Sequence, residues 1–248
     1  MNALAVLETH IADTYLRLRR GMGLLALLFP PVLWLGGAMW FGRPLQTSMS
    51  AYYHTGMRDV FVGVLCAIGS FLFLYKGFTR KEDLALNIAG ACAAGIAFFA
   101  MDARGDCQAS GGGFSLHGAF AVAFFMAIAY VCIFLSGDGP EVGIAAATRA
   151  RYVAVQKACG AVMTACMAAG LVYAFLLPKP VRAGLCARNM VFWLEALAVW
   201  AFSIYWIVKS LEYDYAVSWL PWRRPVRVHG PATSDASSLP EKSHAETP

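Results

Sequence analysis

Six apolar runs, each close to the length of a membrane-crossing helix, take up nearly half of this 248-residue chain. A helix of about 20 apolar residues crosses the ~30 Å hydrocarbon core of a bilayer. The runs cover residues 22–41, 57–75, 84–101, 116–135, 157–177 and 191–208. Backbone groups in lipid must be paired within the protein, which only helices and closed barrels achieve. Runs such as VFVGVLCAIGSFLFLY lack the alternation of a barrel strand. The sequence therefore predicts an all-α polytopic membrane bundle of six transmembrane helices.

The composition excludes the main alternatives to a membrane protein. Hydrophobic residues make up 59% of the chain and charged residues 14%, against about 25% charged in an ordinary soluble domain. This is too little charge for a water-soluble surface and too much apolar content for disorder. The net charge of +5 comes from basic residues clustered beside apolar runs, unlike a DNA-binding face. We expect membrane lipids as partners and no nucleic acid; the oligomeric state stays open.

The basic residues predict the orientation of the helices. Six of them flank one side of the predicted membrane: Arg43, Arg58, Arg104, Lys179, Arg182 and Arg188. Fourteen lie on the other: Arg17, Arg19, Arg20, Lys76, Arg80, Lys81, Arg149, Arg151, Lys157, Lys209, Arg223, Arg224, Arg227 and Lys242. Lysine and arginine concentrate in cytoplasmic loops of membrane proteins. Both termini are therefore predicted to be cytoplasmic.

The two ends of the chain differ from the apolar middle. Near the N-terminus, apolar residues at helical spacing predict an amphipathic helix on the inner leaflet: Leu4, Leu7, Ile11 and Leu18. Pro30 and Pro31 predict a kink in the first span. The chain thus divides into an interfacial helix, a transmembrane domain, a basic juxtamembrane segment and a disordered tail, over residues 1–20, 21–209, 210–230 and 231–248.

Polar residues collect at one predicted membrane depth, on the extracytoplasmic side. They are Ser50, His54, Arg58, Asp59, Asp102, His117 and Glu195. Buried polar groups in a membrane are costly and mark functional sites. If the second helix starts early, Ser50, His54 and Arg58 share one face. The inner half offers only the lone, uncharged Asn87 and Gln156.

This polar cluster has several possible uses. It is suited to binding a lipid headgroup or small polar ligand, with Arg58 holding an anionic group. It also suits proton relay or catalysis, and the plainer alternative is an ion-pair network that joins helix ends. His54, His117 and Glu195 are candidate zinc ligands, because imidazole and carboxylate both bind zinc. We expect at least three side chains of one set to face a shared cavity on the extracytoplasmic side, and Arg58 to pair with one of its carboxylates. The set is His54, Asp59, Asp102, His117 and Glu195.

Three segments carry a family resemblance: SMSAYYHTGMRDVFVGVL, LHGAFAVAFF with His117, and VFWLEALAVWAFSIYWIVK with Glu195. They resemble uncharacterised bacterial six-span proteins that look like distant relatives of the Frag/DRAM/Sfk membrane family. The resemblance covers roughly residues 43–209. It implies a bacterial-type inner-membrane location, cytoplasmic termini and a polar extracytoplasmic site, without a common chemistry.

A second resemblance concerns the alkaline ceramidase and progestin-receptor superfamily of zinc-dependent membrane hydrolases. Ser50 and His54 match its Ser-x-x-x-His element, and Asp59 follows at a shorter distance than expected. The paired histidine motif and a seventh span are absent from the sequence. A metal-dependent hydrolase of lipid amides or esters is thus the alternative to a ligand-binding protein. A structural or assembly protein without ligand is the third reading.

Two of the seven cysteines lie in predicted outer loops, Cys107 and Cys186. The other five fall within predicted spans and are interpreted as small packing residues. If the outer side is an oxidising periplasm, the two loop cysteines are expected to form a disulfide. It would connect the start of the fourth span with the start of the sixth.

Overall fold

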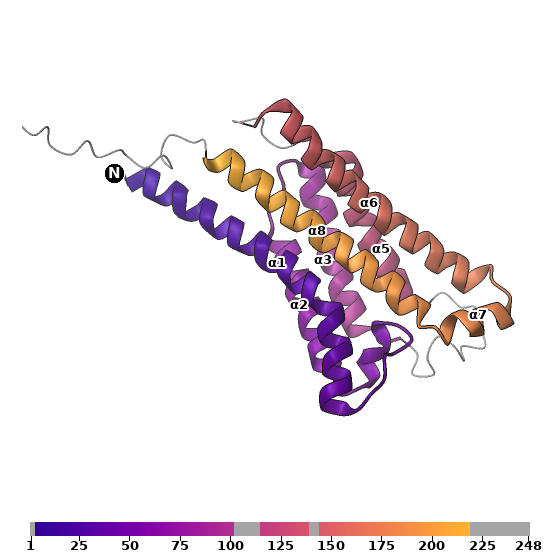
Figure 1. Ribbon diagram of the computed structural model, residues 1–248. Helices are drawn as coiled ribbons and strands as arrows, with labels where there is room; N and C mark the ends of the chain where they lie inside the picture. Colours follow the sequence, from indigo (N-terminus) through magenta and orange to yellow (C-terminus); the bar gives the residue numbers. More distant parts are fainter. Residues whose placement is uncertain (1–2, 102–114, 139–143, 219–248) are drawn as a thin grey trace, which may run out of the picture.

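The structure is a computed structural model that describes residues 3–101, 115–138 and 144–218 (Figure 1). In these ranges every regular element is helical. The α-helices are α1 (Ala3–Phe41), α2 (Arg58–Leu74), α3 (Arg80–Phe98), α5 (Leu116–Tyr130), α6 (Ala146–Phe175), α7 (Lys179–Cys186) and α8 (Met190–Ser218). A 3₁₀ turn, η1 (Ser50–His54), precedes α2, and a π-helical turn, η2 (Val131–Leu135), extends α5. The predicted all-α class is confirmed.

Six helices pack as a closed ring. Each contacts the next in the order α1, α2, α3, α5, α6, α8, and α8 returns to α1. Glycines allow close approach at two of these contacts. A Cβ on Gly90 of α3 would lie 2.7 Å from the Gly69 carbonyl oxygen of α2. At the α1–α8 contact, the Ser203 hydroxyl donates to the Gly23 carbonyl at 2.7 Å. Small residues at such contacts let helix backbones approach closely.

Within the described ranges, four helices are long and apolar enough to cross a membrane: His10–Phe41, Leu116–Leu135, Ala146–Phe175 and Met190–Asp214. The other two helices of the ring, α2 and α3, do not meet these criteria of length and apolar composition. Helix α2 has 17 residues, and α3 begins with the charged run Arg80, Lys81, Glu82, Asp83.

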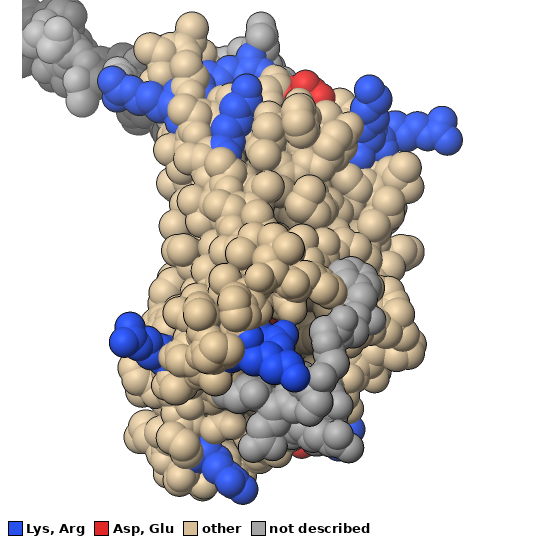
Figure 2. Space-filling view, turned by 90° about the vertical axis from the view of Figure 1, so that its right-hand side faces the viewer, with Lys and Arg blue, Asp and Glu red and all other residues tan. Residues whose placement is uncertain are grey.

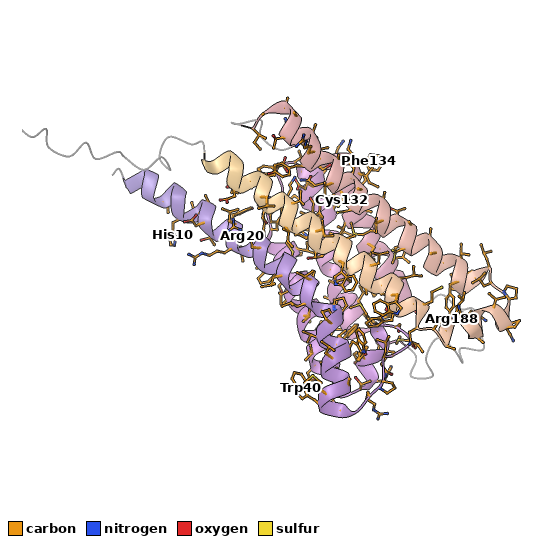
Figure 3. The ribbon with its side chains drawn as sticks, in the orientation of Figure 1. His10, Arg20, Trp40, Cys132, Phe134 and Arg188 are labelled. Atoms are coloured by element: carbon orange, nitrogen blue, oxygen red, sulfur yellow. The ribbon has the colours of Figure 1, made fainter. Side chains whose placement is uncertain are left out.

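The outer surface of the ring is apolar. Large hydrophobic side chains are exposed on several helices, including Leu35, Leu74, Phe134, Leu176 and Leu197. On the face shown in Figure 2, a belt without lysine or arginine separates basic side chains at the top from those lower down. In Figure 3, Arg20 lies toward the end that holds the N-terminus, and Arg188 lies at the opposite end. An exposed apolar belt of this kind suits contact with lipid.

Two helix boundaries differ from the prediction, the start of α6 and the end of α8. Helix α1 runs without interruption from Ala3 to Phe41 and bends partway (Figure 1), as expected for an N-terminal helix that continues into the first apolar run. The predicted apolar stripe near its start points outward: Leu7, Ile11 and Leu18 are exposed, while Leu16 is buried. Helix α6 begins eleven residues before the predicted start at 157, and α8 continues ten residues past the predicted end at 208. The tail from residue 219 onward lies outside the described residues.

The longer helices bring charged residues together at the end of the ring near the N-terminus. Arg19 is fully buried, donates to the Tyr75 hydroxyl and to the Lys209 carbonyl oxygen, and is surrounded by aromatic rings. The Lys209 ammonium lies 4.0 Å from Glu82 Oε1, with both side chains at least 98% buried. We call Arg19, Tyr75, Glu82 and Lys209 the inner charged cluster.

The inner charged cluster corrects the expectation that this half holds only lone, uncharged polar groups. Gln156 is not alone either, since its amide donates to Glu212 Oε2 at 2.8 Å. The mismatch arises because the sequence places these side chains beyond the apolar runs, where long charged residues usually reach water. Here the helices continue past the apolar runs and pack against one another there.

Candidate functional site

Ser50 and His117 form a directly hydrogen-bonded pair at the end of the ring opposite the N-terminus. The Ser50 Oγ lies 2.8 Å from His117 Nε2, and both residues are 93% buried. His117 Nδ1 lies 2.8 Å from the Phe99 carbonyl oxygen. A carbonyl can only accept, so Nδ1 carries the proton. In the neutral imidazole, Nε2 is then an acceptor, and the Ser50 hydroxyl donates to it.

Local structure explains these positions. Ser115 caps α5 by accepting from the Gly118 N–H at 3.0 Å, which places His117 in the first turn. Phe99 follows the last residue of α3 with extended backbone angles, so its carbonyl turns away from the helix axis. Ser50 opens the turn η1 directly after the loop from α1. The start of α5, the end of α3 and the turn η1 are distant in sequence, and together they hold Ser50 and His117 in contact.

Glu195 of α8 completes the cluster. Its Oε2 accepts the Met49 backbone N–H at 2.6 Å, and its Oε1 lies 3.5 Å from Ser50 Oγ. We call Ser50, His117 and Glu195 the outer polar cluster. Because the Ser50 hydroxyl has one proton, it donates to His117 when the imidazole is neutral, and Glu195 is the alternative acceptor at the longer distance.

Two hollows meet at Glu195. A small cavity of about 60 Å³ reaches Ser50 and Glu195 and is otherwise lined by apolar side chains such as Phe61, Phe124 and Phe202. An open groove of about 210 Å³ runs between α5, α6 and α8, past Gly118 and Gly170. Among the described residues that line either hollow, Glu195 is the only charged one. An apolar chain in the groove would have its end at this carboxylate.

The remaining predicted site residues lie elsewhere or outside the described residues. His54 is exposed, and its Nε2 donates to the Met101 carbonyl oxygen at 2.9 Å. Arg58 donates to the Tyr53 hydroxyl at 3.0 Å and lies over that ring. Asp59 is exposed in the first turn of α2. Asp102 lies outside the described residues.

The second helix does not start early, so the condition for a shared face of Ser50, His54 and Arg58 is not met. The chain forms a 3₁₀ turn over Ser50–His54 and starts α2 only at Arg58. With three residues per turn, positions four apart point in different directions. Ser50 is accordingly buried and His54 exposed. The predicted pairing of Arg58 with a carboxylate is likewise replaced, among the described residues, by its contact with Tyr53.

The candidate zinc ligands are separated. Within residues 3–101, 115–138 and 144–218, no three histidine, cysteine, aspartate or glutamate side chains are grouped as metal ligands. His117 and Glu195 both approach Ser50, whereas His54 lies on the Met101 carbonyl. The set His54, His117 and Glu195 is thus not brought together as a metal site. Of the described residues His54, Asp59, His117 and Glu195, only Glu195 lines either hollow, and Asp102 lies outside the described residues.

Cys186 ends α7, is buried and is bound in a disulfide. Its predicted partner, Cys107, lies outside the described residues, so that pairing stays a prediction. Five other cysteines are free, and four of them are buried: Cys92, Cys132, Cys159 and Cys166. Cys66 is half-buried. These five agree with the predicted packing role.

Comparison with known proteins gives no further constraint. The chain matches no protein-family model, no curated protein and no solved structure.

Proposed function

We propose that this chain is a six-span membrane protein that binds a lipid-like amphiphile at the outer polar cluster. The polar end of the amphiphile would meet Glu195 and Ser50, and its apolar part would lie in the groove between α5, α6 and α8. The observation that carries the proposal is the position of one carboxylate between two apolar hollows. A charge in such surroundings is costly without a functional reason.

The membrane assignment rests on the four long apolar helices, the apolar exterior and the ring that α2 and α3 complete. We assign α2 and α3 as the two shorter spans. The outer polar cluster then lies on the side away from the N-terminus, which the distribution of basic residues assigns to the extracytoplasmic leaflet. For a bacterial host, this is the periplasmic face of the inner membrane.

The chemistry of the cluster defines the ligand class. Glu195 and the Nε2 atom of His117 are hydrogen-bond acceptors, and Ser50 accepts or donates. A head with hydroxyl, amide N–H or ammonium donors suits these partners. An anionic phosphate head would face the Glu195 carboxylate, and Arg58, the residue expected to hold such a head, lies against Tyr53 instead. We therefore propose a neutral or cationic head with hydrogen-bond donors.

Photocrosslinking with lipid analogues tests this proposal. Purified full-length protein in vesicles would be exposed to a diacylglycerol that carries a diazirine in one acyl chain, and to the matching phosphatidic acid. We expect diacylglycerol adducts on peptides of α5, α6 and α8, and far fewer with phosphatidic acid. Equal labelling by both lipids, or adducts spread evenly over the exterior, would contradict the proposal.

A substitution in the groove provides the matched control. A Cβ at Gly170 or at Gly63 would meet no atom within 4 Å, but only Gly170 lines the groove. Gly170→Leu should fill the groove and lower diacylglycerol crosslinking at least tenfold. Gly63→Leu, on the outer side of α2, should leave it unchanged.

A further inference from the structure

We infer that Ser50 is a nucleophile and His117 its general base, so that the outer polar cluster carries out acyl transfer from a lipid ester. This inference rests on the proposed amphiphile site and adds a reaction to it. It requires a hydroxyl next to a base of the correct tautomer, a group that holds the base, and a route for the ester.

The hydroxyl and the base satisfy the first requirement. A reactive serine needs a neighbouring base within about 2.6–3.2 Å, and Ser50 Oγ lies 2.8 Å from His117 Nε2. The tautomer is fixed by the Phe99 carbonyl, which accepts from Nδ1 at 2.8 Å. That carbonyl orients the imidazole as a third group does in other serine–histidine pairs.

The Glu195 carboxylate stabilises the positive charge that His117 acquires during the reaction. Once His117 has taken the serine proton, its ring is positively charged, and Nε2 can no longer accept. The Glu195 carboxylate lies one hydroxyl away, with Oε1 3.5 Å from Ser50 Oγ. A carboxylate near a developing imidazolium stabilises it, and this effect is larger where water is excluded.

The reaction changes no oxidation state and needs no redox partner. Ser50 Oγ attacks the ester carbonyl carbon as its proton passes to His117 Nε2, and a tetrahedral adduct forms. The adduct collapses with cleavage of the bond to the alcohol oxygen, which takes the proton from His117 and leaves. Water then attacks the acyl-Ser50 ester while His117 accepts its proton and returns that proton to Ser50. The net reaction is ester plus water to carboxylic acid plus alcohol.

The route for the ester is the pair of hollows at Glu195. The groove between α5, α6 and α8 opens along the ring, and the smaller cavity reaches Ser50. An acyl chain in the groove would bring its carbonyl to the cluster, and a free hydroxyl on the alcohol part would meet Glu195. A neutral lipid ester with a hydroxyl group is therefore the substrate class.

The probe for Ser50 is a long-chain alkyl fluorophosphonate, applied to full-length protein in vesicles. Attack by the serine oxygen forms an oxygen–phosphorus bond and expels fluoride, and His117 accepts the proton. We expect one adduct per chain, mapped by mass spectrometry to the peptide with Ser50. His117→Gln should lower the rate by about 10²–10⁴-fold, the usual contribution of a general base.

Ser136→Ala is the matched control, because Ser136 is also buried but donates to the Cys132 carbonyl of its own helix. It should leave labelling unchanged, while Ser50→Ala abolishes it. Folded wild-type protein that binds diacylglycerol but acquires no adduct, or acquires it at another serine, would overturn the inference and leave the proposed function intact. Labelling at Ser50 without diacylglycerol binding would support the nucleophile and refute the proposed function.

Discussion

Removal of the Glu82 carboxylate should destabilise the ring through the inner charged cluster. Glu82 Oε2 accepts the Phe78 backbone N–H at 2.9 Å, and Oε1 lies 4.0 Å from the Lys209 ammonium. Two unit charges at that distance attract by about 4 kcal/mol at an effective dielectric constant of ~20. Glu82→Ala would leave the Lys209 charge and the Phe78 N–H without this acceptor. Breaking one partner of a buried pair costs about 3–5 kcal/mol.

The assay is the free energy of unfolding in mixed micelles, titrated with a denaturing detergent and followed by tryptophan fluorescence. Glu82→Gln should lose less than Glu82→Ala, because the amide oxygen still accepts from Phe78. Adding Lys209→Met to Glu82→Ala should recover part of the loss, since no unpaired ammonium is left buried. Lys76→Met is the control: it removes a similar ion pair with Asp83 in which Lys76 is largely exposed, and it should not shift the midpoint measurably. The reasoning fails if Glu82→Ala costs no more than Lys76→Met.

Two more predictions test helix packing and the disulfide. Gly90→Ala should lower the free energy of unfolding by about 1–3 kcal/mol, because its Cβ would lie 2.7 Å from the Gly69 carbonyl oxygen; Gly63→Ala, with open space around it, should be neutral or stabilising by up to about 1 kcal/mol in the same titration. Cys186 should resist maleimide in unreduced membranes and react after reduction, and Cys107→Ser should make it reactive without reduction. Reaction of Cys186 with maleimide in unreduced wild-type protein would contradict the disulfide assignment.

The sequence was most informative where a pattern repeats. Runs of about 20 apolar residues located all six helices of the ring, and four of these helices are long and apolar enough to cross a membrane. It was least informative beyond those runs, where burial depends on which helices meet. Arg19 and Lys209 look like ordinary residues at the ends of spans, and only the packing of α1, α3 and α8 shows that they are buried. The sequence does hold one signal for this burial: if the helix continues past the apolar run, the charged residue falls on the same face as the buried residues of that run.

The outer polar cluster could be predicted in part. Glu195 interrupts an apolar run, and Ser50 and His117 lie near the starts of two others, so the sequence identified all three as candidates. The contact between Ser50 and His117 could not be predicted, because the two residues are 67 positions apart and meet only through a turn and the start of a helix. The Phe99 carbonyl that orients His117 is a backbone group and leaves no signal in the side-chain sequence. The expectation for His54 and Arg58 failed because it required a continuous helix where the chain makes a 3₁₀ turn.

Native mass spectrometry of full-length protein taken directly from its membrane tests the central claim, that the outer polar cluster holds an amphiphile. Wild type should retain one neutral or cationic lipid per chain at collision energies that strip the other lipids. Glu195→Gln keeps an oxygen for the Met49 N–H but replaces the other acceptor with a donor, and it should lose at least nine-tenths of that retained lipid. Equal retention by wild type and Glu195→Gln, or retention of an anionic phospholipid only, would contradict the assignment.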